Sequence, residues 1–106
     1  MSTIWNNNLM LPATELIATM TGSTVLIGNL LFPPVKLIMD NQSTVSIVLY
    51  ISFDGGVTLI QWHTFPAGEA IILDDDAFTF PKGTMFYGNG ASGNFSISYT
   101  YAKLAG

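Results

Sequence analysis

The sequence contains no cysteine, so disulfides and thiolate metal sites are excluded. Basic residues are also scarce, because the only cations are Lys36, Lys82 and Lys103, which are far apart in the chain. Binding to a phosphate backbone requires clustered lysine and arginine, and the net charge here is −4. We therefore expect no nucleic-acid partner.

Long apolar runs are missing as well. The most apolar stretch, residues 24–39, is interrupted by an asparagine, two prolines and a lysine, and falls well short of the roughly 20 apolar residues of a membrane-spanning helix. Residues 1–20 have neither the positively charged start nor the continuous apolar segment of a secretory signal. We expect no membrane partner.

Charged residues make up only 9% of the 106 residues and hydrophobic residues 49%, whereas roughly a quarter of an ordinary soluble domain is charged. A single domain of this size leaves about 35–40% of its unfolded-chain surface in water, so these apolar residues cannot all be interior. We expect contacts with other subunits to bury the apolar residues that remain on the surface. A homo-oligomer is predicted, with a trimer favoured.

Two segments alternate apolar and smaller or polar residues with the period of a β-strand, residues 44–53 and 95–103. Asp54-Gly55-Gly56 follows the first and predicts a tight hairpin with a two-residue turn. That register places Leu49, Ile51 and Phe53 on one face with Ile60 and Trp62. It leaves His63 beside Tyr50 and Ser52 on a more polar face.

Further strands are predicted at 24–31, 35–40, 57–64, 70–73 and 84–87, with turns at 65–68 and 81–83. Residues 15–20 are ambiguous between helix and strand, and their β-branched residues favour a strand. Seven to eight short strands indicate an all-β fold, a single antiparallel β-sandwich or jelly roll over residues 11–106.

Residues 1–10 are interpreted as an N-terminal arm. The apolar pair Ile4-Trp5 is separated from the body by Asn6-Asn7-Asn8. An apolar anchor on a polar tether suggests docking on a neighbouring subunit, although a frayed terminus is the alternative. The predicted interface residues are Ile4, Trp5, Leu9, Met10 and Leu11.

Three motifs could carry chemistry, and each has a simpler explanation. Residues 88–93 match G-x-G-x-x-G, but a strand follows where nucleotide binding needs a helix, so a glycine-rich hairpin loop is expected. Asp74-Asp75-Asp76 reads as a solvated turn, with a calcium ion shared between subunits as the alternative. His63 lacks any local signature of a nucleophile. We predict no catalytic residue, cofactor or metal site.

Aromatic residues offer one further possibility, a platform on which sugar rings stack. Most of them lie at strand spacing, which favours the core instead. The candidates are Trp62, Phe86, Tyr87, Tyr99 and Tyr101.

Three segments resemble small β-sandwich structural proteins of tailed bacteriophages: VKLIMDNQSTVSIVLYISFDGG (35–56), FPAGEAIILD (65–74) and FPKGTMFYGNG (80–90). The resemblance begins near LPAT (11–14), covers most of the chain and rests on turn signatures. It implies a virion protein, either a capsid decoration or cement protein or a minor head or neck protein, with the major capsid protein as partner. The alternative is a carbohydrate- or receptor-binding module on a virion surface or fibre.

Overall fold

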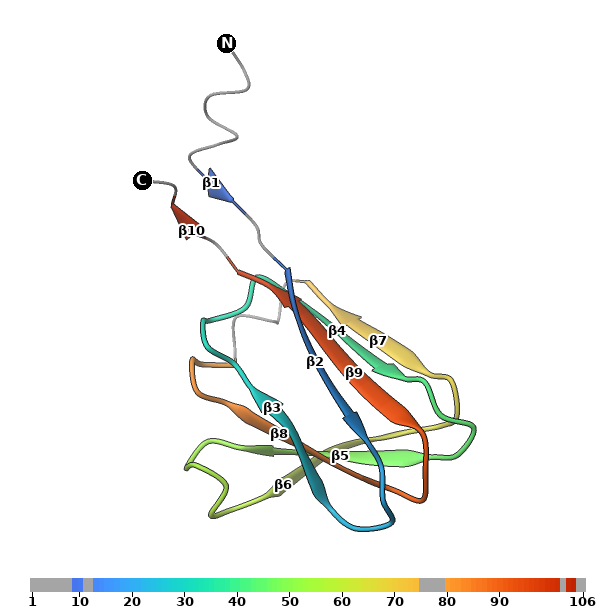
Figure 1. The fold of residues 1–106 in the computed structure, drawn as a ribbon. Helices are drawn as coiled ribbons and strands as arrows, with labels where there is room; N and C mark the ends of the chain where they lie inside the picture. The colour runs from blue at the N-terminus through green and yellow to red at the C-terminus, as the bar shows by residue number, and fades with distance from the viewer. Residues whose placement is uncertain (1–8, 11–12, 75–79, 102, 105–106) are drawn as a thin grey trace.

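Eight strands form two four-stranded antiparallel sheets that pack face to face (Figure 1). The computed structural model describes residues 9–10, 13–74, 80–101 and 103–104. The first sheet has the order β2-β9-β4-β7 and the second the order β3-β8-β5-β6. The strands are β2 (Ala13–Thr19), β3 (Val25–Asn29), β4 (Lys36–Asn41), β5 (Ile47–Ser52), β6 (Ile60–Phe65), β7 (Ala70–Leu73), β8 (Met85–Gly90) and β9 (Asn94–Thr100). The predicted all-β sandwich is confirmed.

Two short strands extend this body. β1 (Leu9–Met10) pairs antiparallel with β10 (Lys103–Leu104), and Figure 1 shows the pair beyond the end of the sandwich at which β2 begins and β9 ends. The described part of the chain contains no helix, hence none that could cross a membrane.

The ambiguous segment at 15–20 is a strand. β2 pairs with β9 along its whole length, from Ala13 opposite Thr100 to Thr19 opposite Asn94. Leu16 and Ala18 point to the core, and Ile17 points outward and is half exposed. Strand pairing therefore agrees with the preference of the β-branched residues in this segment.

The core fills the space between the inner faces of the two sheets. Alternate residues of β5 and β9 are almost fully buried, as the alternating sequence predicted. Phe65 at the end of β6 meets Phe95 of β9 edge to face, with ring centroids 4.9 Å apart, and so joins the sheets. The residues with the most complete burial include Leu37, Met39, Ile47, Leu49, Phe86, Ile97 and Tyr99. Burying each such side chain contributes roughly 1.5–3 kcal/mol.

The predicted glycine-rich loop at 88–93 is wrong in its first half, because β8 continues to Gly90 and only residues 91–93 turn. A Cβ on Gly90 would lie 2.7 Å from Cγ1 of Ile47, and one on Gly88 would lie 3.0 Å from Sδ of Met20. These glycines are needed for close packing against the core. Gly93, with φ of +86°, is the residue that turns the chain.

The predicted two-residue turn after β5 is also wrong. β5 ends at Ser52 and β6 begins at Ile60, so residues 53–59 form a longer loop, and Phe53 is exposed instead of buried. Ile51 does lie opposite Ile60, as the predicted register requires. Beyond this pair a β-bulge shifts the register by one residue.

After the bulge, His63 lies opposite Leu49, and not on the polar face beside Tyr50 and Ser52. Trp62 packs on the edge of the core, 6.1 Å from the ring of Phe80. Trp62 therefore packs against the core as predicted, although the bulge leaves it with no residue directly opposite in β5.

Candidate interaction surfaces

Exposed apolar side chains gather at one end of the sandwich. The ends of β3 and β5 both lie beside the start of β8, since Met85 is opposite Asn29 on one side and Ser52 on the other. The loops that leave there, β3–β4 and β5–β6, together with the first residue of β6, carry seven of the ten large hydrophobic residues that are exposed in the described chain. These seven form the apolar end: Leu31, Phe32, Val35, Phe53, Val57, Leu59 and Ile60.

The opposite end of the sandwich is polar. Its loops are residues 21–24, 42–46, 66–69 and 91–93, which consist largely of Ser, Thr, Gly and Gln. None of these residues is a large exposed hydrophobic. The two ends of the same fold therefore have opposite solvent preferences, which an isolated soluble domain does not require.

The β5–β6 loop, residues 53–59, is held by side-chain hydrogen bonds to its own backbone. The carboxylate of Asp54 accepts hydrogen bonds from the Ser52 hydroxyl and from the Thr58 amide, each at 2.8 Å. The Ser52 side-chain oxygen in turn accepts a hydrogen bond of 2.9 Å from the Gly56 backbone amide. The hydrogen bonds from Thr58, and after them the one from Ser52, lower the pKa of Asp54 to about 2. The loop thus presents Val57, 85% exposed, on a fixed backbone.

The β3–β4 loop, residues 30–35, lies at the base of the β1–β10 extension (Figure 1). Phe32 stacks on Tyr101, with ring centroids 4.3 Å apart. The Leu31 amide donates to the Tyr99 hydroxyl, and the Val35 amide donates to the carbonyl of Thr100. This apolar loop is therefore fixed to the segment that leads out of the sandwich.

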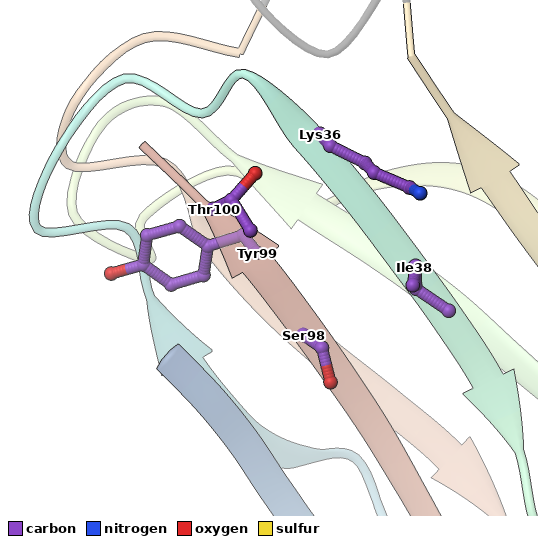
Figure 2. A pocket seen from close by; sticks show the side chains of 5 residues that line it. All are labelled: Lys36, Ile38, Ser98, Tyr99 and Thr100. Atoms are coloured by element: carbon purple, nitrogen blue, oxygen red, sulfur yellow. The ribbon is translucent and has the colours of Figure 1, made fainter. Parts of the chain in front are cut away.

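A shallow hollow of about 100 Å³ opens on the outer face of the first sheet (Figure 2). Lys36 and Ile38 of β4 lie opposite Thr100 and Ser98 of β9, and the small serine between larger neighbours leaves the space. Tyr99 also lines it, although its side chain is buried. The surface open to the hollow is apolar.

The predicted interface residues are only partly described. Leu9 and Met10 form β1, paired with β10. Ile4, Trp5 and Leu11 lie outside the described residues. The arm at 1–10 as a separate docking element therefore stays a prediction. Sequence reasoning missed the apolar end because it assigned residues such as Phe53 and Ile60 to buried strand faces.

Two of the three motifs that could carry chemistry lie in strands and turns, where they contribute to the fold. G-x-G-x-x-G covers the end of β8 and the turn at 91–93, and β9 follows where a helix would be needed to hold a pyrophosphate. His63 Nε2 lies 2.7 Å from Oε1 of Glu69, which links β6 to the turn at 66–69. Asp75 and Asp76 lie outside the described residues, and Asp74 lies 4.0 Å from Lys36. Within the described ranges, no group of three or more His, Asp or Glu is placed to hold a metal ion.

The aromatic residues do not form one platform. Phe86 and Tyr99 are buried in the core and Trp62 packs against it. Tyr87 lies opposite Tyr50 on the second sheet, whereas Tyr101 stacks on Phe32 at the base of the extension. The five candidate aromatics therefore do not form one continuous surface for a sugar ring.

No family model matches the chain, and no curated protein matches it. Among solved structures, it is similar to a chain from the disulfide-linked pili that form Bacillus endospore appendages, with a TM-score of 0.52. The sequences are 13% identical, and the alignment covers 93% of this chain and 90% of that chain. What the two share is the fold. A relationship with bacteriophage proteins is not shown, and the absence of cysteine excludes disulfide links in this chain.

Proposed function

We propose that this chain is a non-enzymatic structural subunit that packs against other protein subunits, copies of itself among them, through its apolar end. The seven exposed side chains of this end carry the proposal. Together they offer on the order of 600 Å² of apolar surface, if a fully exposed large side chain contributes roughly 150–200 Å². A standard protein interface covers about 800 Å² on each partner. The apolar end is therefore large enough to form the centre of such an interface.

Such an assembly would be held without disulfide links, since the chain has no cysteine. Apolar contacts would supply the affinity, and repetition over many copies would raise it through effective concentration. The scarcity of charge agrees with this arrangement, because charged residues are depleted at the centre of protein interfaces.

In its finer form, the proposal places the subunit on a bacteriophage head as a decoration or cement protein or a minor head protein, bound to the major capsid protein. The turn segments at 35–56, 65–74 and 80–90 support this setting. The fold shared with a pilus chain supports a second setting, an extracellular filament of repeated subunits. Both settings require the same property, a surface that self-assembles or joins a lattice.

The carbohydrate- or receptor-binding module has weaker support. Its best remaining group is Tyr87, which is half buried beside the β5–β6 loop. Glycan binding that disappears in Tyr87→Ala would favour this function over the structural one.

Electron microscopy of the purified chain, together with quantitative mass spectrometry of particles from the source, tests the proposal. Filaments or rings of the chain alone support the self-assembling subunit, and many copies on a virion head support the decoration protein. Dispersed single molecules, with no copies in any particle, would overturn both.

A further inference from the structure

The β5–β6 loop and the hollow on the first sheet have complementary properties. Val57 is the most exposed large hydrophobic residue of the described chain, at 85%, and projects from a loop whose backbone is already fixed. The hollow holds about 100 Å³. An engineered protein cavity of about 150 Å³ takes a benzene molecule, so this hollow is suited to one aliphatic side chain.

The charges beside the two features are opposite. Asp54 is ionised at neutral pH, like an ordinary exposed aspartate, and hydrogen bonds from Thr58 and Ser52 lower its pKa further. Lys36 lines the hollow, and its own contact with Asp74 is 4.0 Å long between side chains that are 44% and 66% exposed. Such an exposed ion pair contributes little, so the Lys36 charge is available to a partner.

We propose that the β5–β6 loop of one copy seats in the hollow of a second copy, with Val57 in the hollow and Asp54 beside Lys36. This inference rests on the proposed function, and it names the partner and the contact. The loop belongs to the second sheet and the hollow opens on the outer face of the first, so one molecule cannot satisfy both.

A lipid surface fits these observations less well. A loop that enters a membrane interface is ordinarily accompanied by lysine or arginine that binds anionic headgroups. Here the charged group within the loop is Asp54, and the chain carries a net charge of −4. Both features would repel an anionic bilayer, whereas Asp54 is attracted to Lys36.

The contact is heterologous, because different surfaces of the two copies meet. Heterologous contacts close into rings or continue as filaments, unlike an isologous contact, which ends at a dimer. The apolar residues around Val57, such as Phe53 and Leu59, would pack around the hollow on the outer face, where Ile72 is also exposed.

A complementation experiment separates this arrangement from others. Val57→Asp removes the apolar side chain that enters the hollow, and Ser98→Leu fills the hollow. We expect each variant alone to associate at least tenfold more weakly than the wild type. Because each variant keeps one intact surface, an equimolar mixture should form dimers that go no further. Light scattering measures the masses, and thermal melts followed by circular dichroism confirm folding.

Two controls keep the outcomes distinct. Leu26→Asp alters an equally apolar residue, 50% exposed on the second sheet, and should assemble like the wild type. Lys36→Glu is a second hollow variant that tests the same surface should Ser98→Leu fail to fold. If the Val57→Asp variant assembled as strongly as the wild type, or if the mixture formed no dimers, the contact between the β5–β6 loop and the hollow would be overturned and the proposed function would stand. A wild type that never associates would overturn the self-assembling form of the proposed function with it.

Discussion

The Asp54 carboxylate and the Thr58 backbone amide, joined by a 2.8 Å hydrogen bond, close the β5–β6 loop before any partner arrives. Ser52 adds a second bond to the same carboxylate. A loop that is already ordered loses less conformational entropy on binding, which raises affinity without any new contact. The most exposed apolar residue of the described chain, Val57, lies in this preorganised segment.

The titration of Asp54 should report this arrangement. Its pKa is lowered from 3.8 to about 2, chiefly by the Thr58 amide. Because the folded value lies below the unfolded one, the stabilisation is complete above pH 3.8 and is lost as the pH falls toward 2. NMR of the carboxyl carbon should give a midpoint near 2, and Ser52→Ala should raise it. A wild-type midpoint near 3.8 would show that the loop bonds are not formed in solution.

Asn41 should be the most costly polar side chain to remove. It is fully buried at the end of β4, and its amide donates to the carbonyls of Val45, Phe65 and Pro66. Asn41→Ala leaves these buried acceptors without that donor, and we expect it to lower the free energy of unfolding by about 2–3 kcal/mol.

The matched control is Asn89→Ala. The Asn89 side-chain amide donates an exposed hydrogen bond to the Thr24 hydroxyl. Its removal should therefore lower the free energy of unfolding by about 1 kcal/mol or less. Urea denaturation measures both variants. Equal losses would contradict the role assigned to Asn41.

Gly90 should tolerate no side chain. A Cβ there would lie 2.7 Å from Ile47 Cγ1 and 3.2 Å from the Ser46 carbonyl oxygen. The first atom belongs to a buried core side chain and the second to the backbone, so neither can move away easily. We expect Gly90→Ala to destabilise the fold by about 1–3 kcal/mol, the usual cost of overpacking. Gly88→Ala should cost less, because its nearest contact is the flexible end of Met20. Denaturation curves in which Gly88→Ala is the worse variant would contradict this packing.

The alternation in residues 44–53 and 95–103 was enough to predict β5 and β9, and the bounds of β7 were predicted as observed. The predicted register holds next to the loop, where Ile51 lies opposite Ile60 and Tyr50 opposite Gln61. The bulge lies between Leu49 and Tyr50 of β5 and their partners in β6, and the alternation of apolar residues does not mark it.

The apolar end was missed for a related reason. The segments LLFPPV (30–35) and FDGGVTLI (53–60) contain residues that a sequence pattern assigns to the core. Only the fold shows that other residues already fill the core and leave Leu31 and Val57 outside. In retrospect, apolar residues on both sides of Gly55-Gly56, with no room for another strand, were the available signal.

Deletion of residues 1–10 should separate folding from assembly. The described contact of this segment is the pairing of Leu9 and Met10 with β10, outside the sandwich. We expect the shortened chain to melt within a few degrees of the full chain. Loss of assembly in this variant, and in a variant with Ile4→Ser and Trp5→Ser, would support the docked arm, whereas unchanged assembly would remove it from the account.

Self-assembly can be tested by the mass of the purified chain in solution, measured by light scattering over a wide range of concentration. One copy has a mass of 11.4 kDa. We expect a mass several times larger, and a smaller mass for the Val57→Asp variant. A mass of one copy at every concentration would contradict assembly through the apolar end.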